Sequence, residues 1–520
     1  MKSNTLKLGL LATTALAAVM LVGCGDDGSS SGNGPSGEAV IANKTITGVS
    51  QKGPFVNGSS VTVQELDGKT LAQTGKSFKG KISGDKGEFT VSNVSLASQY
   101  ALLEANGYYL NENTGAKSNG PIALNALVDL SKRENVNVNL LTHLEYERAL
   151  HLLSTSKGVA AAKKQAEDEI FKAFGVTGDF ANSEELDILA KGEGDGALLA
   201  ISVLMQGTLS EAELSERLAN FADDIEQDGT WDDAATKAQM ADWASAADLA
   251  AIRDTVEKWN EGNKAPAFEK VVKAFWWNEY GLGPCDASND GEIKLNDNAL
   301  SANHDIDYIC ENGNWHIKLT MTDSRDGTIY KTTRIGTQMW MAENLNYATV
   351  GSRCYNDNAE YCTQYGRLYS WAAAMDSATT GCGYGSFCAA SSGKVQGVCP
   401  NGWHLPDSTE WEMLFTTAGG KDSAGTKLKS AMGWSPNGSD AYGFSALPSG
   451  SWGFGGETEG LFGGIGSEAN FWSSSESFSD RAYEVWMNST SAAAYIENAA
   501  THAVGGSYKH NCFSVRCLKD

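Results

Sequence analysis

The spacing of apolar residues changes part-way along the chain, and no single type of secondary structure accommodates both spacings. Residues 41–120 contain segments such as SSVTVQEL and GEFTVSNV, which alternate or are rich in β-branched residues, with the turn sequences LDGKT and GDKGE nearby. Residues 121–281 carry apolar residues at every third or fourth position, as in NVNLLTHLEYERALHLL. We therefore predict strands followed by an α-helical domain. At 520 residues the chain is also too long for one core, so we expect a multi-domain protein.

The first 24 residues have the three parts of an export signal. Lys2 and Lys7 give a positive start, residues 8–22 are apolar, and the segment LVGC ends in a cysteine. This stretch resembles a bacterial lipoprotein signal peptide, which implies that Cys24 becomes the lipidated N-terminal residue of the mature protein. Gly25 in place of aspartate implies the outer membrane rather than the inner one. The alternatives are an ordinary secretory peptide or a membrane-spanning anchor, for which the apolar run is short.

Three further segments complete the organisation of the chain before residue 321. Residues 25–40 are rich in Gly and Ser and are expected to form a flexible tether. Residues 41–120 resemble small prealbumin-like or carboxypeptidase-regulatory-like domains, which implies a β-sandwich that serves as a spacer or binding module. Residues 282–320 are expected to form a small hairpin-like connector after the helical domain.

One helix of the predicted helical domain carries a candidate metal site. His143, Glu147 and His151 are four residues apart, so they share one helix face and could bind a metal ion. The HExxH order of zinc proteases is absent. A polar stripe beside the apolar one explains the same spacing without a metal.

The cysteines predict disulfide bonds and therefore an oxidising compartment. Cys285 and Cys310 lie in the connector, far from any other cysteine, and should pair. If CFSVRC near the C-terminus is a strand, Cys517 faces inward, where it can bridge to Cys399.

The remaining cysteines would close two short loops. Cys354 would pair with Cys362, and Cys382 with Cys388. Excluding Cys24, nine of the ten cysteines remain, so one is left over. Alternation places Cys512 on the outward face with Ser514 and Arg516. Cys512 is then either a free thiol, which should be the most readily alkylated one, or it pairs with a cysteine of one short loop in place of that cysteine's expected partner.

The last 200 residues contain six motifs in a fixed order: DSRDGTIYKTTRIGTQMWMAENLNYA, YGRLYSWAAAM, GVCPNGWHLPDSTEWEML, GFSALPSG, NFWSSSE and FSVRCLKD. Together they closely resemble the Fibrobacter succinogenes major paralogous domain, over residues 321–520. The third motif is also similar to a segment of formylglycine-generating-enzyme-like domains. This second similarity implies an α+β, C-type-lectin-like fold that is rich in loops.

The third motif also contains the most conspicuous candidate for acid–base chemistry. His404 stands close to Asp407, Glu410 and Glu412. The same residues fit a scaffold, because Asp407 or Ser408 can cap a helix whose positive N-terminal end favours acidic side chains. A catalytic histidine needs a second convergent group, and the sequence shows none. We therefore interpret this motif as part of the fold and predict no catalytic residues here.

The glycine-rich segment 449–476 contains the candidate ligand-binding residues. It has too many glycines for a regular element, and long loops on a rigid sheet often carry binding function. Aromatic faces can stack on sugar rings, and carboxylates can accept sugar hydroxyls or hold a calcium ion. The candidates are Trp452, Phe454, Glu457, Glu459 and Phe462. Apart from this calcium ion, no cofactor is expected.

The composition limits the classes of partner that the chain is expected to bind. Asp and Glu outnumber Lys and Arg by 64 to 40, which gives a net charge of −24 and disfavours nucleic acid. We expect a lipid-anchored cell-envelope protein that presents a C-type-lectin-like module for binding or adhesion to polysaccharide or to another envelope protein. The alternatives are a purely structural envelope protein, or an enzyme related to formylglycine-generating oxidases. No nucleophile elbow, Walker loop or zinc-spaced cluster supports the enzyme.

Overall fold

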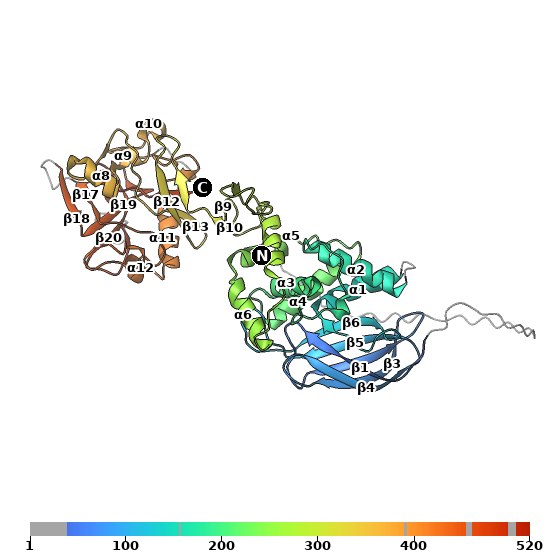
Figure 1. Ribbon diagram of the computed structural model, residues 1–520. Helices are drawn as coiled ribbons and strands as arrows, with labels where there is room; N and C mark the ends of the chain where they lie inside the picture. Colours follow the sequence, from blue (N-terminus) through green and yellow to red (C-terminus); the bar gives the residue numbers. More distant parts are fainter. Residues whose placement is uncertain (1–38, 155–157, 389–392, 454–459, 498–505) are drawn as a thin grey trace, which may run out of the picture.

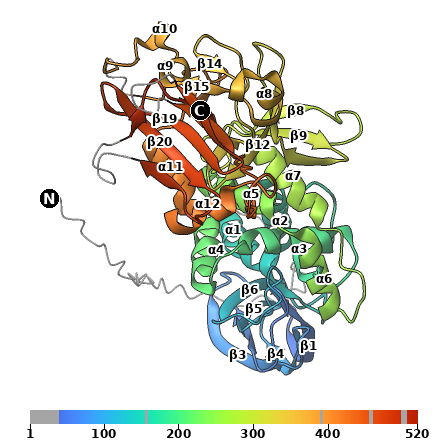
Figure 2. The ribbon, with the colours of Figure 1, turned by 90° about the vertical axis from the view of Figure 1, so that its left-hand side faces the viewer.

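The computed structural model describes residues 39–154, 158–388, 393–453, 460–497 and 506–520. It has two lobes with a narrow connecting region between them (Figure 1). The first lobe contains a β-sheet covered by helices, and the second contains most of the remaining strands. Figure 2 shows the same order from the side: sheet, helices, connector and C-terminal lobe. The expected multi-domain order of a β-rich, a helical and a second β-rich region is confirmed.

The first lobe begins with one seven-stranded sheet in the order β6-β5-β2-β3-β4-β1-β7. The strands are β1 (Ile41–Gln51), β2 (Ser60–Leu66), β3 (Gln73–Ile82), β4 (Glu88–Leu96), β5 (Tyr100–Gly107), β6 (Ile122–Asp129) and β7 (Val138–Asn139). All neighbours are antiparallel except β1 and β7. Because β6 and β7 lie beyond residue 120, the sheet extends past the expected boundary. The sandwich assignment stays a prediction.

Seven α-helices follow: α1 (Leu140–Ser154), α2 (Val159–Ala173), α3 (Glu193–Gln206), α4 (Glu211–Glu226), α5 (Ala234–Ala246), α6 (Leu249–Trp259) and α7 (Glu269–Glu279). The short helix η1 (Ser183–Glu185) lies between α2 and α3. Helix α3 is almost wholly buried, so it forms the centre of this domain. Ser210 and Glu213 form a capping box at the start of α4, because the sequence places Glu three residues after the capping Ser.

No single helix in the described part of the chain has the length and apolar character to cross a membrane. Helices α3 and α4 reach that length and composition only as a pair, and the pair is bent by 115°.

The sheet and the helical domain are joined through a buried ion pair. Lys52 Nζ lies 2.8 Å from a carboxylate oxygen of Glu112, and neither side chain is exposed. Ser202, from the middle of α3, donates to Glu112 and so links the pair to the central helix. Tyr109 adds a hydrogen bond of 2.8 Å to Gln206. Because breaking such a buried pair is costly, these contacts hold the two domains in a fixed arrangement.

The connector forms a three-stranded sheet of β8 (Ile293–Leu295), β9 (Asp307–Glu311) and β10 (Asn314–Ile317). The expected disulfide joins Cys285 to Cys310. From the C-terminal lobe, Lys519 reaches Asp307 at 3.1 Å. The connector therefore contacts the second lobe through side chains as well as through the chain itself.

The C-terminal lobe contains two sheets. The five-stranded sheet has the order β11 (Thr320–Thr322), β12 (Ile329–Ile335), β13 (Gln338–Met341), β24 (Leu518–Lys519) and β16 (Trp403–His404). The larger sheet follows β14 (Ser352–Arg353), β15 (Leu368–Ser370), β23 (Cys512–Phe513), β17 (Ser449–Gly453), β19 (Glu468–Phe478), β20 (Arg481–Asn488) and β21 (Tyr495–Glu497). Two further strands, β18 (Leu461–Ile465) and β22 (Ser507–Tyr508), pair with β17 and β20.

The helices of this lobe are short: α8 (Ala359–Tyr365), α9 (Trp371–Ala374), α10 (Ser377–Thr380), α11 (Ser408–Thr417) and α12 (Lys421–Leu428), with the 3₁₀ turn η2 (Tyr355–Asp357). Helix α11 buries Trp411, Leu414 and Phe415, as its spacing predicts. The lobe thus combines helices with two sheets, and its likeness to C-type lectins stays a prediction.

All four expected disulfides of the described chain form: Cys285–Cys310, Cys354–Cys362, Cys382–Cys388 and Cys399–Cys517. Cys512 is free, but the expectation that it faces outward is wrong, because its side chain is buried. Arg516, also expected outward, is fully buried. Residues 514–517 lie between β23 and β24 and are buried on every side, so alternation along a strand does not apply to them.

Candidate binding site

His404 is held between two carboxylates. Its Nε2 atom lies 2.9 Å from Glu410 and its Nδ1 atom lies 2.8 Å from Asp520, while only 1% of the residue is exposed. Burial acts to raise the pKa of Glu410, but the hydrogen bonds from His404 and from the backbone of Asp407, together with nearby positive charge, outweigh burial and lower that pKa. Of the two expected caps, Asp407 is the one that caps α11, and Glu410 in the first turn completes a capping box. The histidine thus links β16, α11 and Asp520, a carboxylate that the sequence did not indicate.

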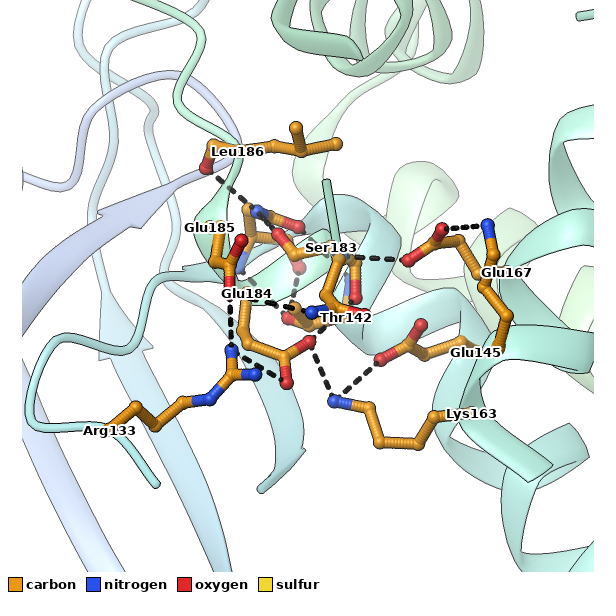
Figure 3. A network of polar contacts seen from close by, with 12 residues as sticks. Arg133, Thr142, Glu145, Lys163, Glu167, Ser183, Glu184, Glu185 and Leu186 are labelled. Atoms are coloured by element: carbon orange, nitrogen blue, oxygen red, sulfur yellow. Dashed lines mark hydrogen bonds and ion pairs between the residues drawn. The ribbon is translucent and has the colours of Figure 1, made fainter. Parts of the chain in front are cut away.

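A second cluster of charges lies in the interior of the first lobe (Figure 3). Lys163 on α2 sits 2.7 Å from Glu184 and 3.4 Å from Glu145 on α1. Burial raises the pKa of Glu145 to about 8, which leaves its carboxyl group protonated at neutral pH. Arg133 also reaches Glu184, at 3.0 Å. Glu145, Lys163 and Glu184 are buried, so the cluster holds elements together rather than contacting a ligand.

Trp452 lies in the hairpin of β17 and β18, at the edge of the C-terminal lobe. Its strand partner across the hairpin is Phe462, and both side chains are half-buried. The guanidinium group of Arg353 stacks 4.0 Å from the centre of a Trp452 ring. Gly460 packs closely against the indole, because a Cβ atom there would lie 2.1 Å from the ring. The hairpin therefore fixes the orientation of Trp452 and leaves part of the ring open to solvent.

Three tyrosines near the Cys354–Cys362 disulfide extend this aromatic surface. The Tyr355 ring is buried and lies 5.1 Å from the Phe462 ring and 5.5 Å from the Tyr361 ring. Tyr361 and Tyr365, one turn apart on α8, stack with their centres 6.2 Å apart and are half-buried. We call Arg353, Tyr361, Tyr365, Trp452 and Phe462 the first aromatic surface. Such rings offer apolar faces, and the tyrosine hydroxyls offer hydrogen bonds.

Comparison with known families places this surface in a recognised domain. Residues 333–519 match the family model described as the Fibrobacter succinogenes major domain. The C-terminal lobe therefore carries a Fibrobacter succinogenes major domain. The match confirms the resemblance shown by the six motifs. Neither a curated protein nor a solved structure matches the chain.

The location of the protein follows from two findings together. Structural disulfides are typical of proteins outside the cytoplasm, and three of the four lie within the major domain. They indicate an extracellular or envelope protein. Cys24, the expected lipidation site, lies outside the described residues.

The structure brings together only part of the predicted binding set. Trp452 and Phe462 are neighbours in the major domain, as the sequence suggested. Phe454, Glu457 and Glu459 lie outside the described residues, so their role stays a prediction. Within the described chain, no group of three or more His, Cys, Asp or Glu side chains is arranged to hold a metal ion.

The histidine stripe on α1 does not form such a group either. The His143 residue is half-buried, and desolvation of its ring lowers its pKa to about 4, so the ring is neutral at pH 7. His151 instead lies 3.9 Å from Glu226 on α4. The stripe therefore packs α1 against its neighbours.

Sequence reasoning missed several aromatic residues of the major domain. Tyr361 and Tyr365 belong to the first aromatic surface, and their spacing of four on either side of Cys362 was a usable signal. Tyr384 and Phe387 are mostly exposed and lie within the short loop CGYGSFC, and Tyr508 is exposed to a smaller extent. Exposed aromatic rings in a loop of seven residues are candidates for binding, because such a loop has no core of its own to fill.

Proposed function

We propose that the chain is a lipid-anchored cell-envelope protein whose major domain binds neutral carbohydrate and so serves in adhesion. The observation that carries the proposal is the first aromatic surface. It places four half-buried aromatic rings between a disulfide-closed loop and a hairpin. Sugar rings have apolar faces of C–H groups and a rim of hydroxyls. An aromatic surface with hydrogen-bonding groups beside it complements both.

The polar groups of the surface suit hydroxyl ligands. Arg353 provides guanidinium donors next to the Trp452 ring, and the hydroxyls of Tyr361 and Tyr365 can donate and accept. The net charge of −24 repels anionic polymers at long range. A neutral polysaccharide is therefore the ligand class that the surface and the whole chain both favour.

Attachment to the envelope would come from Cys24. Its place at the end of the export signal supports lipidation, and several acyl chains on one residue hold a protein stably in a membrane. The outer membrane is the proposed location because Gly25 follows the cysteine. Residues 25–40 would then allow the lobes to move away from the lipid.

The test is the retention of purified full-length protein on insoluble neutral polysaccharides such as cellulose, xylan, mannan and chitin. Trp452→Ala should weaken retention by about 1–3 kcal/mol, as loss of an anchoring aromatic does. Because Trp452 is only half-buried, the variant should lose less unfolding free energy than the ~3–5 kcal/mol typical of a buried tryptophan.

Trp411→Ala is the folding control. Trp411 is fully buried beside Trp340, Phe444 and Phe471. Its replacement by Ala should therefore lower the free energy of unfolding by ~3–5 kcal/mol, measured by thermal or denaturant unfolding. If the wild type is not retained on any of these polymers, the carbohydrate proposal fails. A structural role or a protein partner would then be the better explanation.

A further inference from the structure

A second group of exposed aromatic side chains surrounds the loop closed by Cys382 and Cys388. Tyr384 is 57% exposed and Phe387 is 63% exposed, and both lie inside this loop. Tyr508 on β22 is 39% exposed. Large aromatic rings are seldom left so open without a use, because their burial is strongly favourable.

The rings form an ordered row. Tyr384 packs against His510 with ring centres 5.0 Å apart, and His510 stacks on Tyr508 at 5.1 Å with an interplanar angle of only 10°. The guanidinium group of Arg481 lies 4.0 Å from the centre of the Tyr508 ring. We call Tyr384, Phe387, Tyr508, His510 and Arg481 the second aromatic surface. It repeats the composition of the first surface, which also combines stacked rings with one arginine.

The loop that presents these rings is fixed by a buried lysine. Lys509 is 1% exposed and donates to the backbone oxygens of Ser386 and Ser479, each at 2.9 Å. Its third partner is Glu476, at 2.7 Å, and Glu476 in turn accepts from the backbone N–H of Cys388 at 2.9 Å. The exposed rings are thus held in place before any ligand arrives, which reduces the entropy lost on binding.

The two surfaces are neighbours along the chain that joins β22 to β23. Cys512 is the strand partner of Trp452, and only four residue steps separate it from Tyr508. Four steps span at most about 14 Å even when fully extended. The side chain of Asn511, between them, packs against Gly453, because a Cβ atom there would lie 3.1 Å from its Oδ1 atom.

We infer that the first and second aromatic surfaces are two subsites for one neutral polysaccharide chain. This inference rests on the proposed function and adds that the ligand is a polymer long enough to contact both subsites. Once one part of a chain binds, the neighbouring part is at high effective concentration at the second subsite. The protein would therefore prefer polymers over short sugars, even if each subsite alone binds weakly.

Charge favours this ligand over a polyanion or an acidic protein. Lys509 is already neutralised by Glu476, and the two arginines are stacked on rings. The chain as a whole has an excess of 24 negative charges. The second surface therefore offers ring faces rather than free positive charge.

The experiment compares long and short ligands with the full-length protein. The polymer is whichever of cellulose, xylan, mannan and chitin retains the wild type, and the short probes are its own soluble fragments of about two units. Tyr384→Ala and Tyr508→Ala should each weaken binding of the polymer about ten-fold or more and change binding of the short fragment at the first surface less than about two-fold. Trp452→Ala should weaken both.

Tyr495→Ala is the matched control, because Tyr495 is 41% exposed on β21 and belongs to neither surface. It should change neither binding measurement. Since the altered side chains are exposed, melting temperatures should stay within a few degrees of the wild type.

The outcomes separate the two ideas. If Trp452→Ala loses the polymer while Tyr384→Ala and Tyr508→Ala bind it normally, the second subsite is refuted and the proposed function stands. If polymer and short fragment bind equally well to the wild type, the two-subsite inference also fails. If the wild type binds no polysaccharide but is captured by a protein on the second surface, both proposals fail.

Discussion

Arg516 is the residue at which the loops of the major domain converge. It is fully buried, and its guanidinium group donates to the backbone oxygens of Met341, Phe444 and Ser445 and to the side chain of Asn344. The Phe444 ring lies 4.7 Å from it. A planar group with five donors can satisfy several carbonyls at once, and no other side chain has as many donors. The arginine therefore replaces backbone pairing where the chain is irregular.

Arg516→Met should destabilise the domain by at least about 3 kcal/mol. Methionine fills similar volume, but it leaves several buried carbonyl oxygens without donors, and each costs about 1–3 kcal/mol. Denaturant unfolding of the full chain measures the change. Arg481→Met, at a half-buried site, should cost much less; equal losses for the two variants would contradict this role of Arg516.

Cys512 should resist alkylation in the folded protein. Its thiol is buried, and burial raises its pKa to about 11, so almost no reactive thiolate is present at pH 8. Iodoacetamide followed by peptide mapping should label Cys512 only after denaturation. Rapid labelling of the native protein would show that this part of the structure opens easily.

At the level of single residues, the sequence predicted which cysteines pair, but it did not predict which side chains are buried. Loop spacing was sufficient to pair Cys354 with Cys362, because short loops restrict partners. The alternation rule failed for Cys512 and Arg516, since it assumes a strand with one solvent-facing side. Whether a segment is covered on both sides depends on elements far away in sequence, such as the loop at Phe444.

The buried charges of Figure 3 tie together three elements: α1 through Glu145, α2 through Lys163, and η1 through Glu184. Burial acts to raise the pKa of Glu184, but Lys163, Arg133 and a backbone hydrogen bond together outweigh burial and lower that pKa. For Glu145 burial dominates, so one carboxyl group of the cluster is neutral when the other is charged. The cluster therefore contains a proton that the folded protein holds more tightly than the unfolded chain does.

Stability should fall as this proton is lost. The pKa of Glu145 is about 8 in the folded state against an ordinary 4.5. Its contribution is therefore complete below about pH 4.5 and disappears as the pH rises through about 8. Glu145→Gln keeps the neutral form at every pH. The variant should lose less stability than the wild type between pH 5 and pH 9, as thermal unfolding at each pH would show.

Glu185→Gln serves as the comparison, because Glu185 is the exposed neighbour in the same cluster. It should leave the pH dependence close to that of the wild type. If Glu145→Gln shows the same slope as Glu185→Gln, the carboxyl group of Glu145 does not hold the proton.

At the level of helices and strands, capping residues predicted where a helix begins, whereas the apolar pattern did not identify every strand. Asp407 begins α11 as expected, and Ser210 with Glu213 begins α4 in the same way, because a cap depends on neighbouring residues alone. Strand β6 was assigned to the helical region. Its sequence IALNALVD is mostly apolar, and a short apolar run cannot be separated from a buried helix by periodicity.

The whole molecule joins an N-terminal lobe of sheet and helices to a C-terminal lobe that carries the major domain (Figure 1). The sequence predicted the order of these parts from changes in periodicity and motif. It could not predict their contacts, such as Lys519 with Asp307, because these residues are more than 200 positions apart. The two aromatic surfaces likewise depend on strands that meet only in the folded lobe.

Cys24→Ser should release the protein from the membrane. The variant lacks the thiol to which the lipid would be attached, so fatty-acid labelling should be lost and the protein should leave the membrane fraction. Cys512→Ser, which removes a different free cysteine, should keep both properties. Unchanged fractionation and labelling of Cys24→Ser would show that another segment anchors the protein.

The connector disulfide has a mechanical consequence. If a surface ligand holds the major domain while the N-terminus is held in a membrane, tension passes along residues 282–320. Cys285 and Cys310 are 25 positions apart and covalently joined, so the chain between them cannot be drawn out. At about 3.3–3.6 Å per residue, roughly 80–90 Å of slack is withheld. Under tension the chain between the two cysteines therefore cannot extend, and it becomes extensible only where a reducing environment breaks the disulfide.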